Sequence, residues 1–230
     1  MLLLTGSSRG IGLGIANYFL ARGHIVCGCS RSESALDSPQ YHHTRLDVSD
    51  EKAVRAWVSS VAKQFGRIDT AVCNAGIVKS ALMMSVTPAS ILDQFVATHV
   101  RGVFLVCREV SKVMIRQKSG RIVTLSSPAV AWHLKGASAY TATKAAVEEM
   151  TRVLARELAP AGVTCNVVRP GLVMTDPARA MGDEWAEWLL DQQTIRRTVT
   201  IEEICNVIEF FASPASSAIT GQTLNMCLVG

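Results

Sequence analysis

Short apolar runs alternate with longer amphipathic stretches along almost the whole chain, and this alternation restricts the fold more than any other feature. The runs have the length of strands and cover residues 1–5, 25–30, 41–46, 69–73, 120–126, 163–168 and 222–227. The stretches have helical spacing and cover residues 11–22, 50–65, 88–118 with a break near 97, 138–160 and 201–212, with a shorter helix within 182–192. Strands separated by helices form parallel βαβ crossovers. The sequence therefore predicts an α/β fold, a doubly wound parallel sheet of about seven strands with helices on both faces.

Composition and charge narrow the class of protein. Apolar residues make up 49% of the 230 residues and charged residues 18%, which suits one large core and a single domain over 1–230. The net charge is only +4 and the basic residues are scattered, so we expect neither nucleic acid nor a membrane as a partner. Seven cysteines lack the paired spacings of a disulfide framework or a zinc site, so we expect reduced thiols and no metal.

No targeting or membrane segment is expected. The apolar start Met1–Leu4 is too short for a signal peptide, and cleavage after it would remove the cofactor site. No later stretch of about 20 residues reads as apolar enough to span a bilayer. We therefore expect a soluble, cytoplasmic protein.

The segment Thr5–Gly12 follows the first predicted strand and opens the first predicted helix. Its glycines have the spacing Gly-x-x-x-Gly-x-Gly, not Gly-x-Gly-x-x-Gly. A glycine-rich turn lets backbone N–H groups approach a pyrophosphate, and the helix N-terminus adds a favourable dipole. Ordinary turns also contain glycine, but this one is the first βα turn of the pattern, where a Rossmann fold binds dinucleotides. The loop residues expected to bind are Gly6, Ser8, Arg9, Gly10, Ile11 and Gly12.

The end of the second predicted strand indicates which dinucleotide is bound. An NAD site usually has an acidic residue there, about 20 residues past the loop, to hold the adenosine 2′-hydroxyl. Ser30 and Arg31 occupy this place, and Arg9 lies inside the loop. Guanidinium groups suit a 2′-phosphate because they form charge-assisted, bidentate hydrogen bonds. Either arginine alone could be a solvated surface residue, but both together, without an acid, favour NADP(H) over NAD(H).

Tyr140 and Lys144 are four residues apart near the start of a predicted helix, which puts both side chains on one face. A free tyrosine has a pKa near ~10 and is a poor base at neutral pH. A neighbouring ammonium and the charge of an oxidised nicotinamide would favour the phenolate and lower that pKa. Ser127 ends the preceding strand, where its hydroxyl could stabilise charge on a substrate oxygen. Such a pair alone is usually helix surface, but here it follows a strand-end serine and a dinucleotide loop.

Further short motifs follow the predicted strands in order. They are Asp47-Val48, Asn74-Ala75-Gly76, Arg169-Pro170-Gly171-Leu172-Val173 with Thr175, and Ile219-Thr220-Gly221-Gln222. Together with the loop, Ser127, Tyr140 and Lys144, they make the chain resemble the short-chain dehydrogenase/reductase family over nearly its whole length. The resemblance implies an NADP(H)-dependent oxidoreductase that moves a hydride to or from a small carbonyl or alcohol substrate.

The resemblance also implies roles for single residues. Tyr140 would be the acid/base, Ser127 would position the substrate oxygen, and Lys144 would hold the nicotinamide ribose. Asp47 and Val48 would flank the adenine, and Val173 and Thr175 would bind the carboxamide. The implied cofactor site comprises Gly6, Ser8, Arg9, Gly10, Ile11, Gly12, Arg31, Asp47, Val48, Asn74, Ala75, Gly76, Tyr140, Lys144, Pro170, Gly171, Val173 and Thr175.

The sequence departs from the family pattern at three places. Cys73 replaces the first of two asparagines, at the end of a buried strand, where we expect it to serve packing. His99 replaces an asparagine that helps hold a proton-relaying water, so it is a fourth candidate catalytic residue. Its ring could hold such a water or only fill space at a helix irregularity, and the sequence leaves both open. The ending Asn225–Gly230 lacks the family's Asp-Gly-Gly, which we expect to alter a subunit contact.

Residues 176–198 lie where the family carries its substrate lid. Trp185, Trp188 and Leu189 fall at i, i+3 and i+4, and Met181 and Leu190 add apolar character. This stripe could close over an apolar substrate or pack against the domain or a second subunit, and large stripes are more often structural. Loop position alone adds Met83, Met84, Trp132 and His133 as pocket candidates.

The resemblance further implies a homodimer or homotetramer in which the helices over 98–118 and 138–160 pair with their copies. Apolar stripes on both helices are compatible with this pairing, although either stripe could face the sheet. The stripes are Val103, Val106 and Val110 on the first helix and Val147, Met150 and Leu154 on the second.

Three functions remain open. The first is a ketone or aldehyde reductase, or the reverse alcohol dehydrogenase. The second is a 3-oxoacyl thioester reductase. A carrier-protein substrate would need basic residues near the cleft, such as Arg101, Arg116 and Lys118, but Ala161 is apolar where carrier-dependent relatives often have arginine. The third is a regulator that senses NADP(H) without turnover, which ranks last because such proteins typically lose the tyrosine or the lysine.

Overall fold

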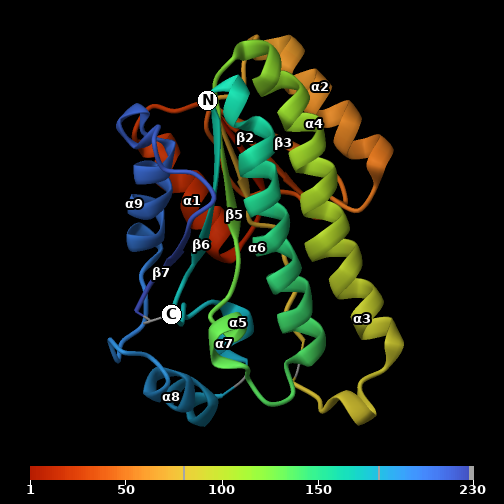
Figure 1. Ribbon diagram of the computed structural model, residues 1–230, viewed down its shortest axis with the longest axis vertical. Coiled ribbons are helices and arrows are strands. Elements are labelled where there is room, and N and C mark those ends of the chain that lie inside the picture. The colour runs from red at the N-terminus through yellow and green to blue at the C-terminus, as the bar shows by residue number, and fades with distance from the viewer. Residues whose placement is uncertain (80, 181, 228–230) are drawn as a thin grey trace.

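A parallel sheet forms the centre of the protein (Figure 1). The computed structural model describes residues 1–79, 81–180 and 182–227. Within these residues, seven strands are ordered β3-β2-β1-β4-β5-β6-β7, and all neighbours pair parallel. They are β1 (Leu2–Thr5), β2 (Val26–Ser30), β3 (Tyr41–Arg45), β4 (Thr70–Cys73), β5 (Gly120–Leu125), β6 (Val163–Arg169) and β7 (Thr223–Asn225). The predicted α/β fold with one doubly wound sheet is confirmed.

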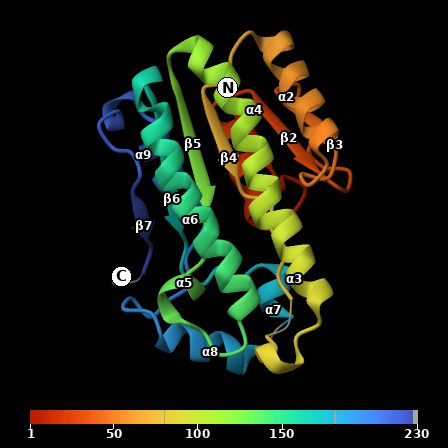
Figure 2. The ribbon, with the colours of Figure 1, turned by 45° about the vertical axis from the view of Figure 1, so that its right-hand side comes forward.

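Helices cover both faces of the sheet, which explains why most of the strands are apolar throughout. Helices α1 and α9 lie on one face, and α2, α4 and α6 lie on the other (Figures 1 and 2). The helices are α1 (Gly10–Ala21), α2 (Glu51–Phe65), α3 (Ala89–Phe95), α4 (Gly102–Gln117), α5 (Ala129–Trp132), α6 (Ser138–Leu158), α7 (Asp176–Arg179), α8 (Asp183–Asp191) and α9 (Ile201–Ala212).

Two cores form because successive strand residues point to opposite faces. Leu2 and Leu4 of β1 pack with α1 and α9, whereas Leu3 packs with α2 and α4. Cys73 lies in the second core, and its sulfur is 3.8 Å from that of Cys107. The expectation that Cys73 serves packing agrees with this burial.

The helix predicted over 88–118 consists of three consecutive segments. Helix α3 continues into a π-helical segment, Val96–Arg101, and then into α4. The predicted break near 97 is therefore confirmed as a widened turn, a feature that is frequent at functional sites. Helices α5 and α7 were not predicted, because four residues are too few for a helical periodicity to appear in a sequence.

The apolar stripes suggested for subunit pairing face the sheet instead. The residues Val103, Val106, Val110 and Val147 are buried in the core of this chain, and Met150 and Leu154 pack against it. Of the two alternatives left open by the sequence, the structure therefore supports the one in which the stripes face the sheet, because a helical stripe gives one apolar face but not the element that covers it.

One helical stretch is long and apolar enough to span a membrane, contrary to the expectation from the sequence. It is Ala89–Gln117, with a mean hydropathy of 1.2 over 18 residues. Its α4 part packs on α2, β4 and β5. The same helix carries Glu109, which pairs with Arg108 at 2.8 Å and with Lys112 at 2.7 Å. These contacts are those of a core helix in a globular domain.

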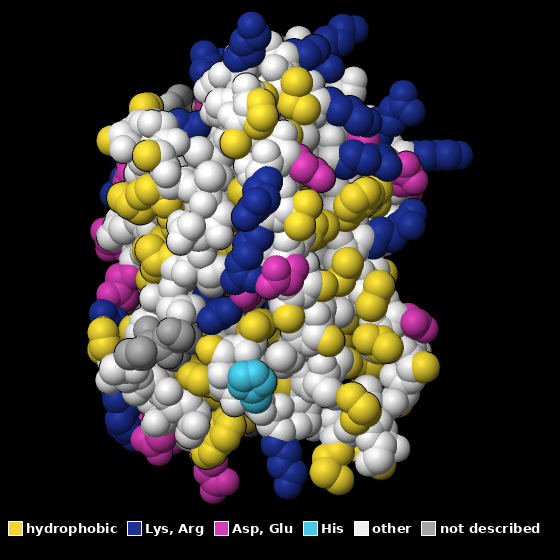
Figure 3. All heavy atoms as spheres, in the orientation of Figure 1, with side chains coloured by type: hydrophobic (Ala, Val, Ile, Leu, Met, Phe, Trp, Pro, Cys, Tyr) yellow, Lys and Arg dark blue, Asp and Glu magenta, His cyan; other side chains and the backbone are white. Residues whose placement is uncertain are grey.

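Parallel strands bring all carboxyl ends to one edge of the sheet, and α5, α7 and α8 gather there (Figure 2). The turn from α4 to β5, which carries Lys118 beside Arg116, lies at the opposite edge. Lys and Arg side chains crowd that end of the viewed face (Figure 3). The suggestion that Arg116 and Lys118 flank the cleft mouth is therefore wrong. Arg101 donates instead to the Ser49 carbonyl at 3.0 Å, near the start of α2.

Candidate functional site

The glycine-rich segment folds as a tight turn between β1 and α1. A Cβ atom at Gly12 would lie 2.0 Å from the Gly6 carbonyl oxygen, so only glycine allows the loop and the helix to pack this closely. In the described residues, α1 begins at Gly10 without a side-chain cap and without an acidic residue in its first turn. Its first N–H groups and the positive end of its dipole therefore form a site for an anion.

Hydrogen bonds tie this loop to the end of β4. Thr5 Oγ1 accepts from the backbone N–H groups of Asn74 (3.0 Å) and Ala75 (2.9 Å). The Asn74 amide donates to the carbonyl oxygens of Thr5 (3.0 Å) and Gly6 (3.2 Å). The asparagine expected to line the cleft therefore also holds the loop. The anchoring role of Thr5 was missed, because a threonine at a strand end has no spacing signal of its own.

A cavity of about 620 Å³ runs along the carboxyl edge of the sheet from the Arg31 turn past the glycine loop to Tyr140 and Lys144. All residues predicted for the cofactor site line it except Gly171 and Val173, which line a neighbouring cavity. His99 also lines the large cavity. Residues distant in the sequence thus form one continuous site.

The large cavity fits a dinucleotide that carries an extra phosphate. Arg9 and Arg31 are exposed and line it. Asp47 also lines it, but its carboxylate accepts hydrogen bonds from the Ser49 N–H (2.9 Å) and hydroxyl (2.7 Å), within its own turn. The guanidinium groups are therefore suited to a phosphate, and the uncapped start of α1 is suited to the pyrophosphate.

A second cavity of about 320 Å³ adjoins the first and has mainly apolar walls. Trp132, Trp185, Trp188 and Leu189 all line it. Helix α8 also packs a small core of its own through Leu189. The stripe predicted within 176–198 therefore both packs on the domain and faces a cavity.

Not all suggested pocket residues reach this cavity. Met83 and Met84 are 54% and 75% exposed, and neither they nor His133 line the cavity. These suggestions were wrong because a position in a loop does not determine where a side chain points. Leu190 packs against the small core of α8, and Met181 lies outside the described residues.

Tyr140 stands where the two cavities meet. It lines both, whereas Ser127 lines only the smaller one and Lys144 only the larger one. Helix α6 carries the tyrosine and the lysine one turn apart, and Ser127 follows the end of β5. The Lys144 ammonium donates to the Leu125 carbonyl at 2.9 Å and lies 5.9 Å from the centre of the Tyr140 ring. The structure thus brings together the three side chains that the sequence singled out.

The pKa of Tyr140 differs from the sequence-based expectation. Burial raises the pKa of this phenol, and its hydrogen bond with Ser127 lowers it by less. The expected lowering had two sources, Lys144 and the charge of an oxidised nicotinamide. In the protein alone, burial destabilises the phenolate, and the Lys144 ammonium is bonded to a carbonyl. Burial also lowers the pKa of Lys144 to about 8, with Glu148 opposing it, so the ammonium persists at neutral pH. Tyr140 is therefore a protonated donor.

His99 lies in the π-helical segment with both ring nitrogens engaged by protein groups. Thr143 donates its hydroxyl proton to the Tyr140 carbonyl at 2.8 Å, so its oxygen accepts from His99 Nδ1–H at 2.9 Å. His99 Nε2 then accepts from the Ile77 N–H at 3.0 Å. Burial, aided by the Lys144 charge, lowers the pKa of His99 to about 3. The imidazole is therefore neutral and links the loop after β4 to α6, which favours the packing interpretation over the water relay.

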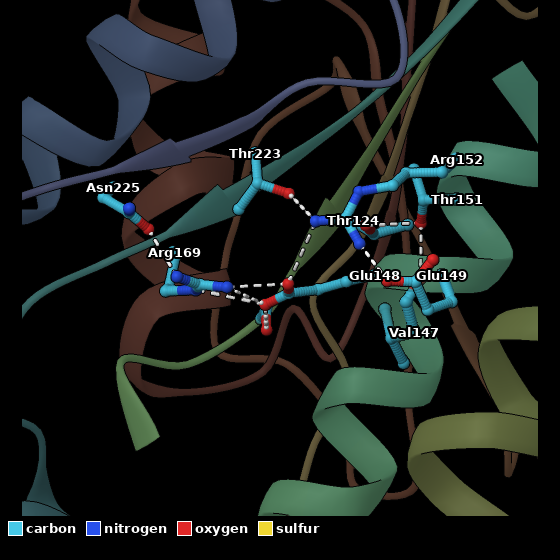
Figure 4. A network of polar contacts seen from close by, with 10 residues as sticks. Thr124, Val147, Glu148, Glu149, Thr151, Arg152, Arg169, Thr223 and Asn225 are labelled. Carbon is cyan, nitrogen blue, oxygen red and sulfur yellow. Dashed lines mark hydrogen bonds and ion pairs between the residues drawn. The ribbon is translucent and has the colours of Figure 1, made fainter. Parts of the chain in front are cut away.

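A buried ion pair joins Arg169 to Glu148 (Figure 4). Arg169, at the end of β6, donates to both carboxylate oxygens of Glu148 at 2.7 and 2.9 Å. Glu148 follows Lys144 by one turn of α6 and also accepts from the Ser126 hydroxyl at 2.5 Å. Asn225 of β7 accepts from Arg169 at 2.8 Å. The Glu148 carboxylate thus joins α6 to the ends of β5 and β6. The sequence did not predict this pair, because no local pattern links Glu148 to Arg169.

Comparisons with known proteins agree with this arrangement. A family model described as enoyl-(acyl carrier protein) reductase matches residues 6–227. The chain is 35% identical to the 3-oxoacyl-(acyl-carrier-protein) reductase FabG of Staphylococcus aureus (strain Mu50 / ATCC 700699), over 97% of this chain and 95% of that protein. It is 34% identical to the protein of that name from Escherichia coli (strain K12), over 97% and 94%.

Solved structures are similar as well. One, titled "ElxO with NADP Bound", has a TM-score of 0.91 at 27% identity and covers 97% of this chain and 95% of that chain. Another, a short-chain type dehydrogenase/reductase from Mycobacterium ulcerans, has a TM-score of 0.91 at 27% identity and covers 98% and 87%.

The contacts of His99 predict how its substitution affects stability. His99→Leu leaves the Ile77 N–H without its acceptor, so the free energy of unfolding should fall by about 1–3 kcal/mol. His99→Asn should lose less, because its amide can still donate to Thr143.

Burial holds the pKa of His99 near 3, below the ordinary value of about 6.5, so wild-type stability should fall as pH drops from about 6.5 to about 3. Denaturant titrations at several pH values should show that the stability of His99→Leu falls less steeply with decreasing pH. Unchanged stability with lost turnover would instead support the relay.

The buried ion pair predicts a second effect. Arg169→Met leaves Glu148 buried without its main cation and should cost about 3–5 kcal/mol of unfolding free energy. The double variant Glu148→Leu/Arg169→Met should recover most of that loss. Arg152→Met is the matched control, because Arg152 is 39% exposed and lies 3.6 Å from Glu148, so it should cost about 1 kcal/mol or less. Urea unfolding measures the stability of all three variants. A double variant that is less stable than Arg169→Met would contradict this account.

Proposed function

The chain belongs to the short-chain dehydrogenase/reductase family, and from this premise we propose that it transfers a hydride between NADP(H) and a carbonyl or alcohol substrate, with Tyr140 as the acid/base. As a member of this family it is an oxidoreductase of C=O and CH–OH groups. The observation that supports the assignment of Tyr140 is that its side chain lines both cavities. A proton donor at this junction can reach a substrate oxygen where substrate and cofactor meet.

Each of the three side chains would have a defined part in the reduction. In reduction, Tyr140 donates its proton to the carbonyl oxygen, and burial keeps that proton on the phenol beforehand. The Ser127 hydroxyl donates a hydrogen bond to the same oxygen and orients it. The Lys144 ammonium stabilises the phenolate that remains and holds the ribose hydroxyls of the cofactor. When bound, the cofactor supplies the hydride. In the reverse direction, Tyr140 takes the proton from the alcohol.

Particular residues would hold the cofactor. The Gly6–Gly12 loop and the start of α1 would bind the pyrophosphate, and Arg9 and Arg31 would bind the 2′-phosphate. Asp47 and Val48 would flank the adenine. A solved neighbour with NADP bound supports this choice of cofactor. Asn74, Ala75 and Gly76 would line the cofactor cleft, together with Pro170 and Gly171. Val173 and Thr175 would bind the carboxamide.

We propose that the substrate is apolar near its carbonyl group. The cavity beside Ser127 is lined by Trp132, Trp185 and Trp188, and residues 176–198 would act as its lid. A 3-oxoacyl thioester is a second candidate, because the two FabG relatives carry that activity in their names. The basic residues suggested for a carrier protein do not support it. A cytoplasmic location also stays a prediction.

Activity and the role of Tyr140 can be tested together. NADPH consumption should be detected with at least one member of a panel of ketones, quinones and 3-oxoacyl thioesters. With that substrate, Tyr140→Phe should lower turnover by about 10²-fold or more, because only the proton donor is lost. NADPH affinity and the melting temperature should be nearly unchanged. Wild-type protein that binds NADPH but consumes none with any member would favour the sensor function, and near-normal turnover in Tyr140→Phe would remove its assigned role.

We further propose a homodimer or homotetramer with closed symmetry. Phe104 on α4 and Val153 on α6 are 50% and 55% exposed, and these neighbouring helices would pair with their copies. Light scattering at micromolar concentration should give a dimer or tetramer mass. The double variant Phe104→Glu/Val153→Glu should give the monomer mass with an unchanged circular dichroism spectrum, because burying carboxylates is unfavourable. A wild-type monomer would refute the proposal.

A further inference from the structure

A polar cluster that the proposed mechanism does not use lies beside the large cavity. Tyr41, His43 and Arg45 alternate along β3, so they point to the same face of the sheet, the face covered by α1. His42 points to the other face, where its ring lies 5.0 Å from that of Phe65 in α2. The cluster therefore belongs to the side of the sheet that carries the glycine loop.

The side chains form a continuous chain of hydrogen bonds from the glycine loop to the turn after β2. Ser7 Oγ lies 2.8 Å from Tyr41 Oη, and Tyr41 Oη lies 3.0 Å from His43 Nδ1. His43 Nε2 lies 3.0 Å from the Ser32 carbonyl oxygen. A carbonyl only accepts, so Nε2 donates to it, and Nδ1 is left to accept from the tyrosine hydroxyl. The Tyr41 oxygen is then free to accept from Ser7.

The strand beside this chain leaves room for it. A Cβ atom at Gly28 would lie 2.4 Å from Ser7 Oγ and 2.6 Å from Tyr41 Oη. Gly28 pairs with His43 in the sheet, so the hydroxyl groups occupy the space that a side chain on β2 would fill. Ser7 is fully buried and Tyr41 is 9% exposed. The Ser7–Tyr41 end of the chain of hydrogen bonds is thus internal, and the chain reaches the surface at Ser32.

The far end of the chain holds the turn that lines the large cavity. Ser30, Arg31 and Ser32 all line that cavity. The Ser32 carbonyl accepts from His43 and, at 2.6 Å, from the Ser30 hydroxyl. The Arg31 carbonyl accepts from Arg45 Nε at 2.9 Å. Side chains of β3 therefore hold two successive carbonyl groups of the turn and determine how the turn presents Arg31.

We propose that Tyr41 and His43 are positioning residues for cofactor selectivity, which couple the pyrophosphate loop to the turn that recognises the adenosine 2′-phosphate. The proposal rests on the NADP(H) site proposed above. Breaking the chain weakens one of the contacts that hold the turn, beside those of Arg45 and Ser30, and so weakens its hold on the 2′-phosphate. The loop itself keeps its place, because the Ser7 N–H also donates to the Cys29 carbonyl at 3.1 Å. Binding of ligands without a 2′-phosphate is therefore preserved.

Equilibrium binding tests this without turnover. The probes are NADPH and NADH, and adenosine 2′,5′-bisphosphate with adenosine 5′-monophosphate. Tyr41→Phe and His43→Phe should each weaken NADPH and the bisphosphate about three- to tenfold, the scale of one or two neutral hydrogen bonds. NADH and the monophosphate should change by less than about twofold. Arg31→Ala, which removes a direct charged contact, should weaken the 2′-phosphate ligands by about tenfold or more.

His42→Phe is the matched control on the same strand and should leave all four affinities unchanged. Melting temperatures are measured for every variant, and Tyr41→Phe keeps the ring, so the fold should survive the loss of one hydroxyl. Parallel weakening of NADPH and NADH would overturn the positioning role, as would unchanged affinities in both variants. A wild-type protein that binds NADPH no more tightly than NADH would instead overturn the proposed cofactor preference, and the positioning role with it.

Discussion

The parallel direction of the strands is the constraint on which the rest of this structure depends. Parallel pairing requires a crossover between neighbouring strands, so helices cover both faces and every carboxyl end lies at one edge of the sheet. The sheet brings together four features that follow or end different strands. They are the glycine loop, the segment Asn74–Gly76, Ser127 and Arg169. The chemistry of the site is therefore assembled by topology, before any side chain contacts a ligand.

Burial then determines how these side chains behave. A tyrosine beside a lysine suggests an easily ionised phenol, yet the low polarity of the site keeps the proton on Tyr140 and lowers the pKa of Lys144 to about 8. The Glu148–Arg169 pair is buried one helical turn farther along α6 and anchors that helix to two strand ends. Placing charges there is costly unless they are paired, so the same carboxylate both satisfies Arg169 and favours the ammonium form of Lys144.

Two histidines serve the site as hydrogen-bond bridges. His99 donates from Nδ1 and accepts at Nε2, joining the loop after β4 to α6. His43 has the opposite arrangement, accepting at Nδ1 and donating from Nε2, and joins β3 to the turn after β2. In both places one ring joins two segments of the chain through a hydrogen bond at each nitrogen. An imidazole suits this task because its two nitrogens point in different directions.

The sequence by itself determined the order of strands and helices, the glycine turn, the two arginines without an acid, and the spacing of Tyr140 and Lys144, because each of these is a local pattern along the chain. It also located the break near residue 97. Only the tertiary structure decided which face of α4 and α6 is buried and that Arg116 lies at the edge of the sheet opposite the cleft. It also decided that Met83 does not line the cavity and that Glu148 pairs with Arg169. These depend on which elements pack together across many residues, and periodicity in one segment carries no information about its partner. The pKa values of Tyr140, Lys144 and His99 were likewise decided by the tertiary structure, because desolvation depends on the folded surroundings and not on the residue alone.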